Sequence, residues 1–174
     1  DNQNKVQLHW TVDGDSIHYA AEVETTGWVG LGFNSNAGMS NADMTVGWRA
    51  ASGSALVTDR LGVINSQPTR DAQQDLINPA VNQYNVASPT PTPTPTPAVA
   101  AVTTVLQFTK RIDTCDASDH AITGGTTRVL YAYNDATPSG GEDSFTHHYI
   151  RGAKSVLLTG RAPAPAPMGA DWLS

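Results

Sequence analysis

The chain has 174 residues and carries a net charge of −6, with charged residues making up only 15% of it. Nucleic-acid binding requires clustered Lys and Arg, and the ten basic residues here form no cluster, so this class of function is excluded. No apolar run approaches the roughly 20 residues that a membrane span needs. The length fits one domain with additional tails.

The first residues lack both an initial Met and a signal-peptide pattern, as expected for a mature end left by cleavage of a secreted protein, or for a trimmed chain. We therefore expect an extracellular location. Cys115 is the single cysteine, which excludes an internal disulfide. It is either a small buried thiol or a residue that bonds to another chain or domain.

Apolar and polar residues alternate with period two along most of the chain. Segments 6–12 and 16–24 alternate in this way and flank Asp13-Gly14-Asp15, which predicts a hairpin. Further strands are expected over 27–33, 44–50, 54–60, 82–86, 102–112, 126–134 and 154–160. About nine short strands with polar turns between them predict an all-β sandwich over residues 1–160. The glycines in 27–33 indicate a close approach to another strand or to a ligand.

Two proline-rich tracts interrupt the strand pattern, one inserted at 88–97 and one forming the tail 161–174. Alternating prolines cannot pair in a sheet and favour extended polyproline II. Both tracts could be flexible. Alternatively, the insertion could be ordered by packing between subunits or by O-linked sugar on its threonines, Thr90, Thr92, Thr94 and Thr96. The tail ends in Trp172 and Leu173, an apolar pair that could contact another copy of the chain, or the tail could be an interdomain linker.

A series of motifs resembles the DOMON family in order and spacing. They are GWVGLGF, GMSNADMTVGW, TDRLG, DAQQDL, LQFTKRIDTCDASDHAI, TRVLYAYN and HHYIRGAKSVLL. The resemblance is greatest to the N-terminal DOMON domain of dopamine β-hydroxylase-like copper monooxygenases. It implies an immunoglobulin-like β-sandwich without catalytic copper, in which the hydroxylating domains are separate and the TCD cysteine, Cys115, is placed to bond outside its own domain.

The resemblance also implies a calcium-like cation site. Its ligands would be the carboxylates of Asp43 and Asp75 and the backbone carbonyls of Met44 and Arg60. Carboxylate and carbonyl oxygens drawn from converging loops are the donors that a hard cation prefers. The alternative is that both aspartates accept hydrogen bonds in turns.

Other DOMON domains bind b-type haem, and this resemblance gives a second cofactor hypothesis. Met39 matches the axial Met, and His147 matches the axial His, with His148 as the substitute. His147 and His148 could also be interpreted as a copper-binding pair, but the sequence supplies no further copper ligands near them.

Three functional hypotheses follow. The first is a secreted, non-enzymatic interaction or structural module that holds a cation, carries O-glycans and assembles with other copies of itself or with adjacent extracellular domains. The second is a haem electron-transfer domain. The third is the regulatory N-terminal domain of a copper monooxygenase.

Overall fold

The computed structural model describes residues 6–36, 38–86 and 101–160, and all regular elements in these ranges are β-strands. No helix in this part of the chain is long and apolar enough to cross a membrane. The proposed glycosylation sites Thr90, Thr92, Thr94 and Thr96 lie outside the described residues, as do Trp172 and Leu173. The strands are β1 (Val6–Asp13), β2 (Ser16–Glu24), β3 (Trp28–Asn34), β4 (Asp43–Arg49), β5 (Ala55–Leu61), β6 (Thr69–Arg70), β7 (Ile77–Val86), β8 (Ala101–Arg111), β9 (Thr126–Asn134) and β10 (Ile150–Leu157).

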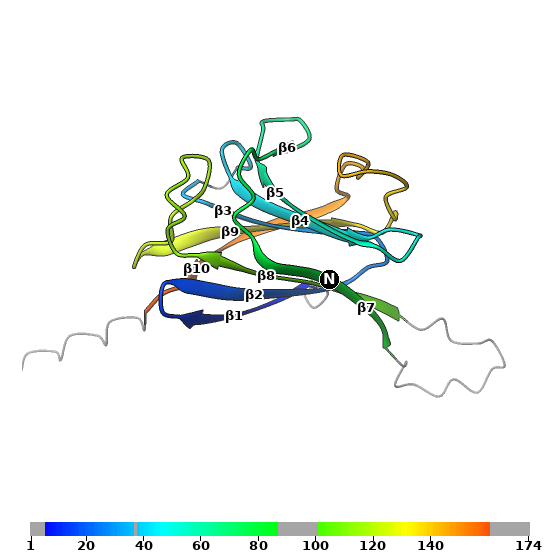
Figure 1. The fold of residues 1–174 in the computed structure, drawn as a ribbon, viewed down its shortest axis with the longest axis horizontal. Helices are drawn as coiled ribbons and strands as arrows, with labels where there is room; N and C mark the ends of the chain where they lie inside the picture. Colours follow the sequence, from blue (N-terminus) through cyan, green and yellow to red (C-terminus); the bar gives the residue numbers. More distant parts are fainter. Residues whose placement is uncertain (1–5, 37, 87–100, 161–174) are drawn as a thin grey trace, which may run out of the picture.

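The strands form two antiparallel sheets that pack face to face (Figure 1). Sheet A has the order β1-β2-β8-β7, and sheet B has the order β10-β9-β3-β4-β5-β6. The predicted hairpin joins β1 to β2, with Asp13 opposite Ser16 and Gly14 at a φ of 60°. This left-handed conformation suits glycine, which has no Cβ to clash.

The prediction of an all-β sandwich is confirmed. All nine expected segments contain a strand, and the tenth strand, β6, has only two residues, which pair with Arg60 and Leu61 of β5. A two-residue strand is too short to show period-two alternation, so the sequence could not indicate it.

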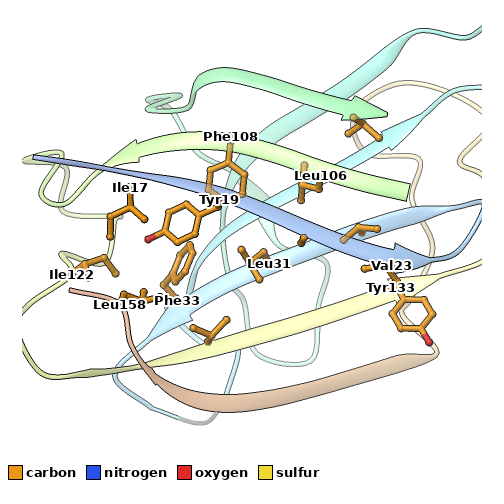
Figure 2. Packing of buried hydrophobic residues seen from close by; sticks show 14 residues of the cluster. Ile17, Tyr19, Val23, Leu31, Phe33, Leu106, Phe108, Ile122, Tyr133 and Leu158 are labelled. Carbon is orange, nitrogen blue, oxygen red and sulfur yellow. The ribbon is translucent and has the colours of Figure 1, made fainter. Parts of the chain in front are cut away.

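The main core lies between the two sheets and is built mainly from the inward-facing residues of β2, β3, β8 and β9 (Figure 2). Tyr19 contacts Phe33 and Phe108, with ring centroids 4.9 and 5.1 Å away, which joins β2, β3 and β8. The sheets approach closely at Gly47 of β4, where an added Cβ would lie 2.7 Å from Leu106 Cδ1. A larger residue at this position would therefore collide with sheet A.

The outer face of sheet B carries two further apolar groups. In one, the loop between β9 and β10 places Phe145 against Trp28 and Trp48, with ring centroids 5.4 and 5.7 Å apart. In the other, Met44 and Leu130 pack with Ala42, Met39 and Ala153. The glycines of β3 make room for this layer, because a Cβ at Gly30 would lie 3.2 Å from the Trp28 ring. The close approach expected from these glycines is thus satisfied by the chain's own side chains.

Candidate functional site

A buried lysine surrounded by carboxylates lies at one end of the sandwich. Lys110 follows Leu106 and Phe108 in the period-two pattern of β8, so its side chain points between the sheets. Its Nζ lies 2.7 Å from Asp43 Oδ1, 3.0 Å from Asp59 Oδ2 and 2.8 Å from Asp119 Oδ1. The ammonium therefore connects sheet A to β4 and β5 of sheet B and to the loop after β8. We call these four residues the Lys110 cluster.

The carboxylates of the Lys110 cluster have further hydrogen-bond partners. The backbone N–H of His120 donates to Asp43 Oδ2 at 3.2 Å, and the Thr114 hydroxyl donates to Asp119 Oδ2 at 2.6 Å. The backbone N–H of Asp75 donates to Asp59 Oδ2 at 3.4 Å. A buried charge is tolerated only where it is paired, and these bonds supply further partners for the carboxylates. They also fix the loops on both sides of the cluster.

The Lys110 cluster holds three carboxylates and one ammonium, so full ionisation would leave it negatively charged. Burial raises the pKa of Asp43 to about 6 and of Asp59 to about 7, although Lys110 opposes both shifts. Burial alone would lower the pKa of Lys110, but Asp43 and Asp59 raise it above its ordinary value. The lysine therefore stays charged at neutral pH, whereas Asp43 and Asp59 gain and lose a proton near that pH.

A second acidic group adjoins the Lys110 cluster and shares Asp119 with it. Carboxylate oxygens of Asp75, Asp116 and Asp119 lie within 4.8 Å of one another. Asp75 Oδ2 is buried and has no hydrogen-bond partner, and burial followed by the charge of Asp119 raises the pKa of Asp75. By contrast, Asp116 accepts bonds from the Ser118 N–H and the Gln73 amide, and its pKa is lowered. We call Asp75, Asp116 and Asp119 the outer acidic group.

The structure brings the predicted cation ligands to the same end of the sandwich but divides them between two groups of contacts. Asp43 is held by Lys110, whereas Asp75 belongs to the outer acidic group. Met44 and Arg60 are ladder partners in β4 and β5, one residue beyond Asp43 and Asp59. The donors of the outer acidic group are all oxygens, which suits a hard cation such as Ca²⁺.

The Arg60 side chain has a separate structural role on the outer face of sheet B. It is fully buried, bonds to Asp143 at 2.8 Å and to the carbonyl of Pro68 at 2.9 Å, and stacks 4.8 Å from the Phe145 ring centroid. Arg60 thereby anchors the loop that carries Phe145, a role that its place in the TDR motif did not indicate.

The two predicted haem ligands make different contacts in the structure. Met39 packs against the apolar group that contains Ala42, Met44 and Leu130, whereas the backbone carbonyl of His147 accepts a bond from the Asn134 side chain. Axial ligation of a haem iron by Met39 and His147 stays a prediction.

The face between these two positions is filled. Trp28, Val46, Trp48 and Phe145 pack there as one cluster, so the described residues do not fit a haem in this arrangement. His147 and His148 lie beside each other, with ring centroids 4.1 Å apart, and burial lowers the pKa of His148. Neither histidine belongs to a metal-ligand group among the described residues.

Cys115 is exposed and lies in the loop between β8 and β9. Its φ of 62° is unusual for a residue with a Cβ, and its backbone N–H donates to Asp113 Oδ1 at 2.9 Å. Of the two interpretations that the sequence left open, the buried thiol is therefore wrong. A bond from Cys115 to another chain or domain stays a prediction.

Three central residues of the site were missed by sequence reasoning: Lys110, Asp59 and Asp119. A signal for two of them was present, because Lys110 shares the alternation of Leu106 and Phe108, and Asp59 shares that of Val57. A charged residue at a core-facing position of a strand indicates a buried partner of opposite charge. Asp119 lies in a loop, where no periodicity could indicate its direction.

Comparison with known proteins identifies the family. Residues 2–87 match the family model described as "DOMON domain". The chain carries a DOMON domain. It is 32% identical over 160 residues to DBH-like monooxygenase protein 1 of Homo sapiens and 31% identical over 159 residues to the protein of that name in Mus musculus. Each alignment covers 91% of this chain and 23% of the relative, so the chain spans about a quarter of those proteins.

The fold is also similar to solved cytochrome domains. The cytochrome domain of Myriococcum thermophilum cellobiose dehydrogenase matches with a TM-score of 0.55 at 14% identity, covering 91% of this chain and 80% of that one. The cytochrome b domain of pyranose dehydrogenase from Coprinopsis cinerea matches with a TM-score of 0.51 at 15% identity, covering 82% of this chain and 67% of that one. At such low identity these matches establish a shared sandwich fold.

Proposed function

We propose that this DOMON domain is a non-catalytic structural and interaction module of a longer extracellular protein, and that a hard cation stabilises one end of it. The observation that carries the proposal is the Lys110 cluster together with the outer acidic group. The titratable residues at this end of the sandwich serve to tie loops and sheets to one another. Lys110 is enclosed by three carboxylates, which leaves it protonated and unable to act as a base or nucleophile.

The cation is assigned to the outer acidic group. Lys110 already neutralises part of the charge on Asp43, Asp59 and Asp119, whereas Asp75 Oδ2 is buried and unpaired. A Ca²⁺ ion ligated by Asp75 and its neighbours would satisfy that oxygen and offset the excess negative charge. Asp75 and Asp116 come from separate loops, before β7 and after β8, so the ion would hold these loops together.

Calcium-dependent stability tests this assignment. The wild-type domain should melt at a higher temperature in millimolar CaCl₂ than in EGTA, because a ligand that binds only the folded state stabilises it. Asp75→Asn should abolish the calcium effect, whereas the control Asp135→Asn, at an exposed position outside both acidic groups, should retain it. A wild-type melting temperature that is the same in CaCl₂ and EGTA would refute the cation site.

The likeness to cytochrome domains favours haem as a second candidate cofactor. The packing of Phe145 against Trp28 and Trp48 opposes it, because a haem on this face would have to displace the loop. The absorbance spectrum of purified protein supplied with hemin distinguishes a haem domain from a non-haem module. A Soret band with Met/His ligation that Met39→Leu removes would establish the cytochrome function; its absence would support the non-haem module.

Extracellular location and O-glycosylation of Thr90, Thr92, Thr94 and Thr96 are part of the same proposal. The alternating Thr-Pro sequence of the insertion supports it. Expression through a eukaryotic secretory pathway followed by intact-mass measurement tests it. A mass that equals the bare polypeptide would exclude the glycans.

A further inference from the structure

The loop between β9 and β10 places a ring and a carboxylate on the outer face of sheet B. Phe145 packs on Trp28 and Trp48, and Asp143 pairs with Arg60. The Arg60 guanidinium also lies over the Phe145 ring, 4.8 Å from its centroid. We call the three residues beneath the loop, Arg60, Trp28 and Trp48, the covered aromatic site.

Arg60 is a buried cation that is paired through this loop. Its side chain is fully buried, and its ion-pair partner among the described residues is Asp143, whose own side chain is 77% exposed. The Thr58 hydroxyl and the backbone carbonyls of Pro68 and Glu142 accept its other N–H bonds, but they carry no charge. A buried cation requires an anion beside it, so a group that replaces Asp143 has to be negatively charged.

The covered aromatic site also contains two buried donors that lack acceptors. Trp28 and Trp48 are 4% and 0% exposed, and neither indole Nε1 has a hydrogen-bond partner in the part of the chain that the structure describes. Most buried donors in native proteins are paired, and leaving one unpaired lowers stability. The two indoles therefore favour a ligand that brings oxygen acceptors of its own.

The outer end of the loop is attached by groups that solvent reaches. Arg70 Nε lies 2.7 Å from Glu142 Oε2, with the two side chains 46% and 42% exposed. The Gln67 amide donates to the Asp143 carbonyl at 3.1 Å, also at the surface. Exposed ion pairs contribute little to stability, so this end of the loop can leave the sheet more easily than a strand of the core.

We propose that the covered aromatic site binds a small aromatic carboxylate, and that the loop fills the site with its own ring and carboxylate when the ligand is absent. The carboxylate of the ligand replaces Asp143 at Arg60, and its ring replaces Phe145 on the two tryptophans. A hydroxyl or carbonyl oxygen on that ring accepts from an indole N–H. This site shares no residue with the proposed cation site, so either can fail without the other.

Isothermal titration of the full chain with 3-(4-hydroxyphenyl)propionate tests the proposal. The wild type should bind it, and the double variant Asp143→Ala/Phe145→Ala should bind it more tightly, by about tenfold or more, because the competing groups of the loop are gone. The neutral amide of the same compound should bind both proteins more weakly, by about tenfold or more, because it cannot pair with Arg60. A wild type that does not bind the acid at about 10 mM would overturn the proposal, as would an amide that binds as well as the acid.

A second variant keeps the test independent of the folding of the double variant. Glu142→Lys sets a like charge against Arg70 and leaves Asp143 and Phe145 unchanged. It should loosen the loop and tighten binding of the acid by about two- to fivefold. Glu22→Lys, the same charge change on β2 of sheet A, is the matched control and should bind as the wild type does. Equal affinities of these two variants would show that the loop does not compete for the site, and the proposal would be wrong.

Discussion

Lys110→Met removes the ammonium at the centre of the Lys110 cluster and keeps a side chain of similar length. Three buried carboxylates then lose their shared partner, which lies 2.7 to 3.0 Å from each of them. Removing one member of a buried ion pair costs about 3–5 kcal/mol of unfolding free energy. For a domain of this size that corresponds to a fall in melting temperature of roughly 6–20 °C.

The loss should depend on pH, and its sign follows from the carboxylates. Without the ammonium, Asp43 and Asp59 can stay buried only if they bind protons, so the folded state binds more protons than the unfolded state. Stability of the variant should therefore fall more steeply than that of the wild type as the pH rises from 5 to 8.

Urea denaturation of both proteins at the two pH values measures this effect. Lys154→Met is the matched control, because Lys154 is exposed on β10 and should lose little stability. If Lys110→Met unfolds within 1 kcal/mol of the wild type at pH 8, or loses the same amount at both pH values, the reasoning is refuted.

Two further predictions concern the cluster and the packing between the sheets. Burial raises the pKa of Asp59 to about 7, so protonation of this group stabilises the folded state. This stabilisation is complete below about pH 3.8, the ordinary pKa of an aspartate. That stability is lost as the pH rises through 7. Asp59→Asn should consequently gain unfolding free energy relative to wild type between pH 5 and 7, by up to about 1.4 kcal/mol per pH unit, in urea denaturation; a constant difference would contradict the shift. Gly47→Ala places a methyl group 2.7 Å from Leu106 Cδ1 and should lower unfolding free energy by about 1–3 kcal/mol in the same assay. Gly141→Ala has open space at the added Cβ and should have little effect.

Much of the fold could be predicted because the strand signal is local. In β2 the buried residues Ile17, Tyr19, Ala21 and Val23 alternate with exposed or half-buried ones, which the sequence shows directly. The order of the strands depends on pairings between distant segments. The placement of β8 between β2 and β7, for instance, has no local signature. The short strand β6 depends entirely on its neighbour β5.

The candidate site was predictable only in part, for a related reason. The motifs NADM and DAQQD indicated Asp43 and Asp75, which belong to two adjoining acidic groups that share Asp119. The partner of Asp43 is an ammonium supplied by the opposite sheet, 67 residues away along the chain. Motif resemblance indicates which residues carry chemistry, but the charge that faces them depends on how the two sheets are superimposed.

Lys110 also has a consequence for how β8 is registered in sheet A. A shift of β8 by one residue would turn Lys110 to the solvent face and bring Thr109 or Arg111 toward the carboxylates. Thr109 cannot neutralise them, and the longer guanidinium of Arg111 does not match a site in which Nζ lies 2.7 to 3.0 Å from the carboxylate oxygens. A hydrophobic residue at position 110 would leave the carboxylates unpaired in every register. The cluster therefore penalises a misregistered sheet more than an apolar core would, which is the advantage that offsets the cost of burying four ionisable groups.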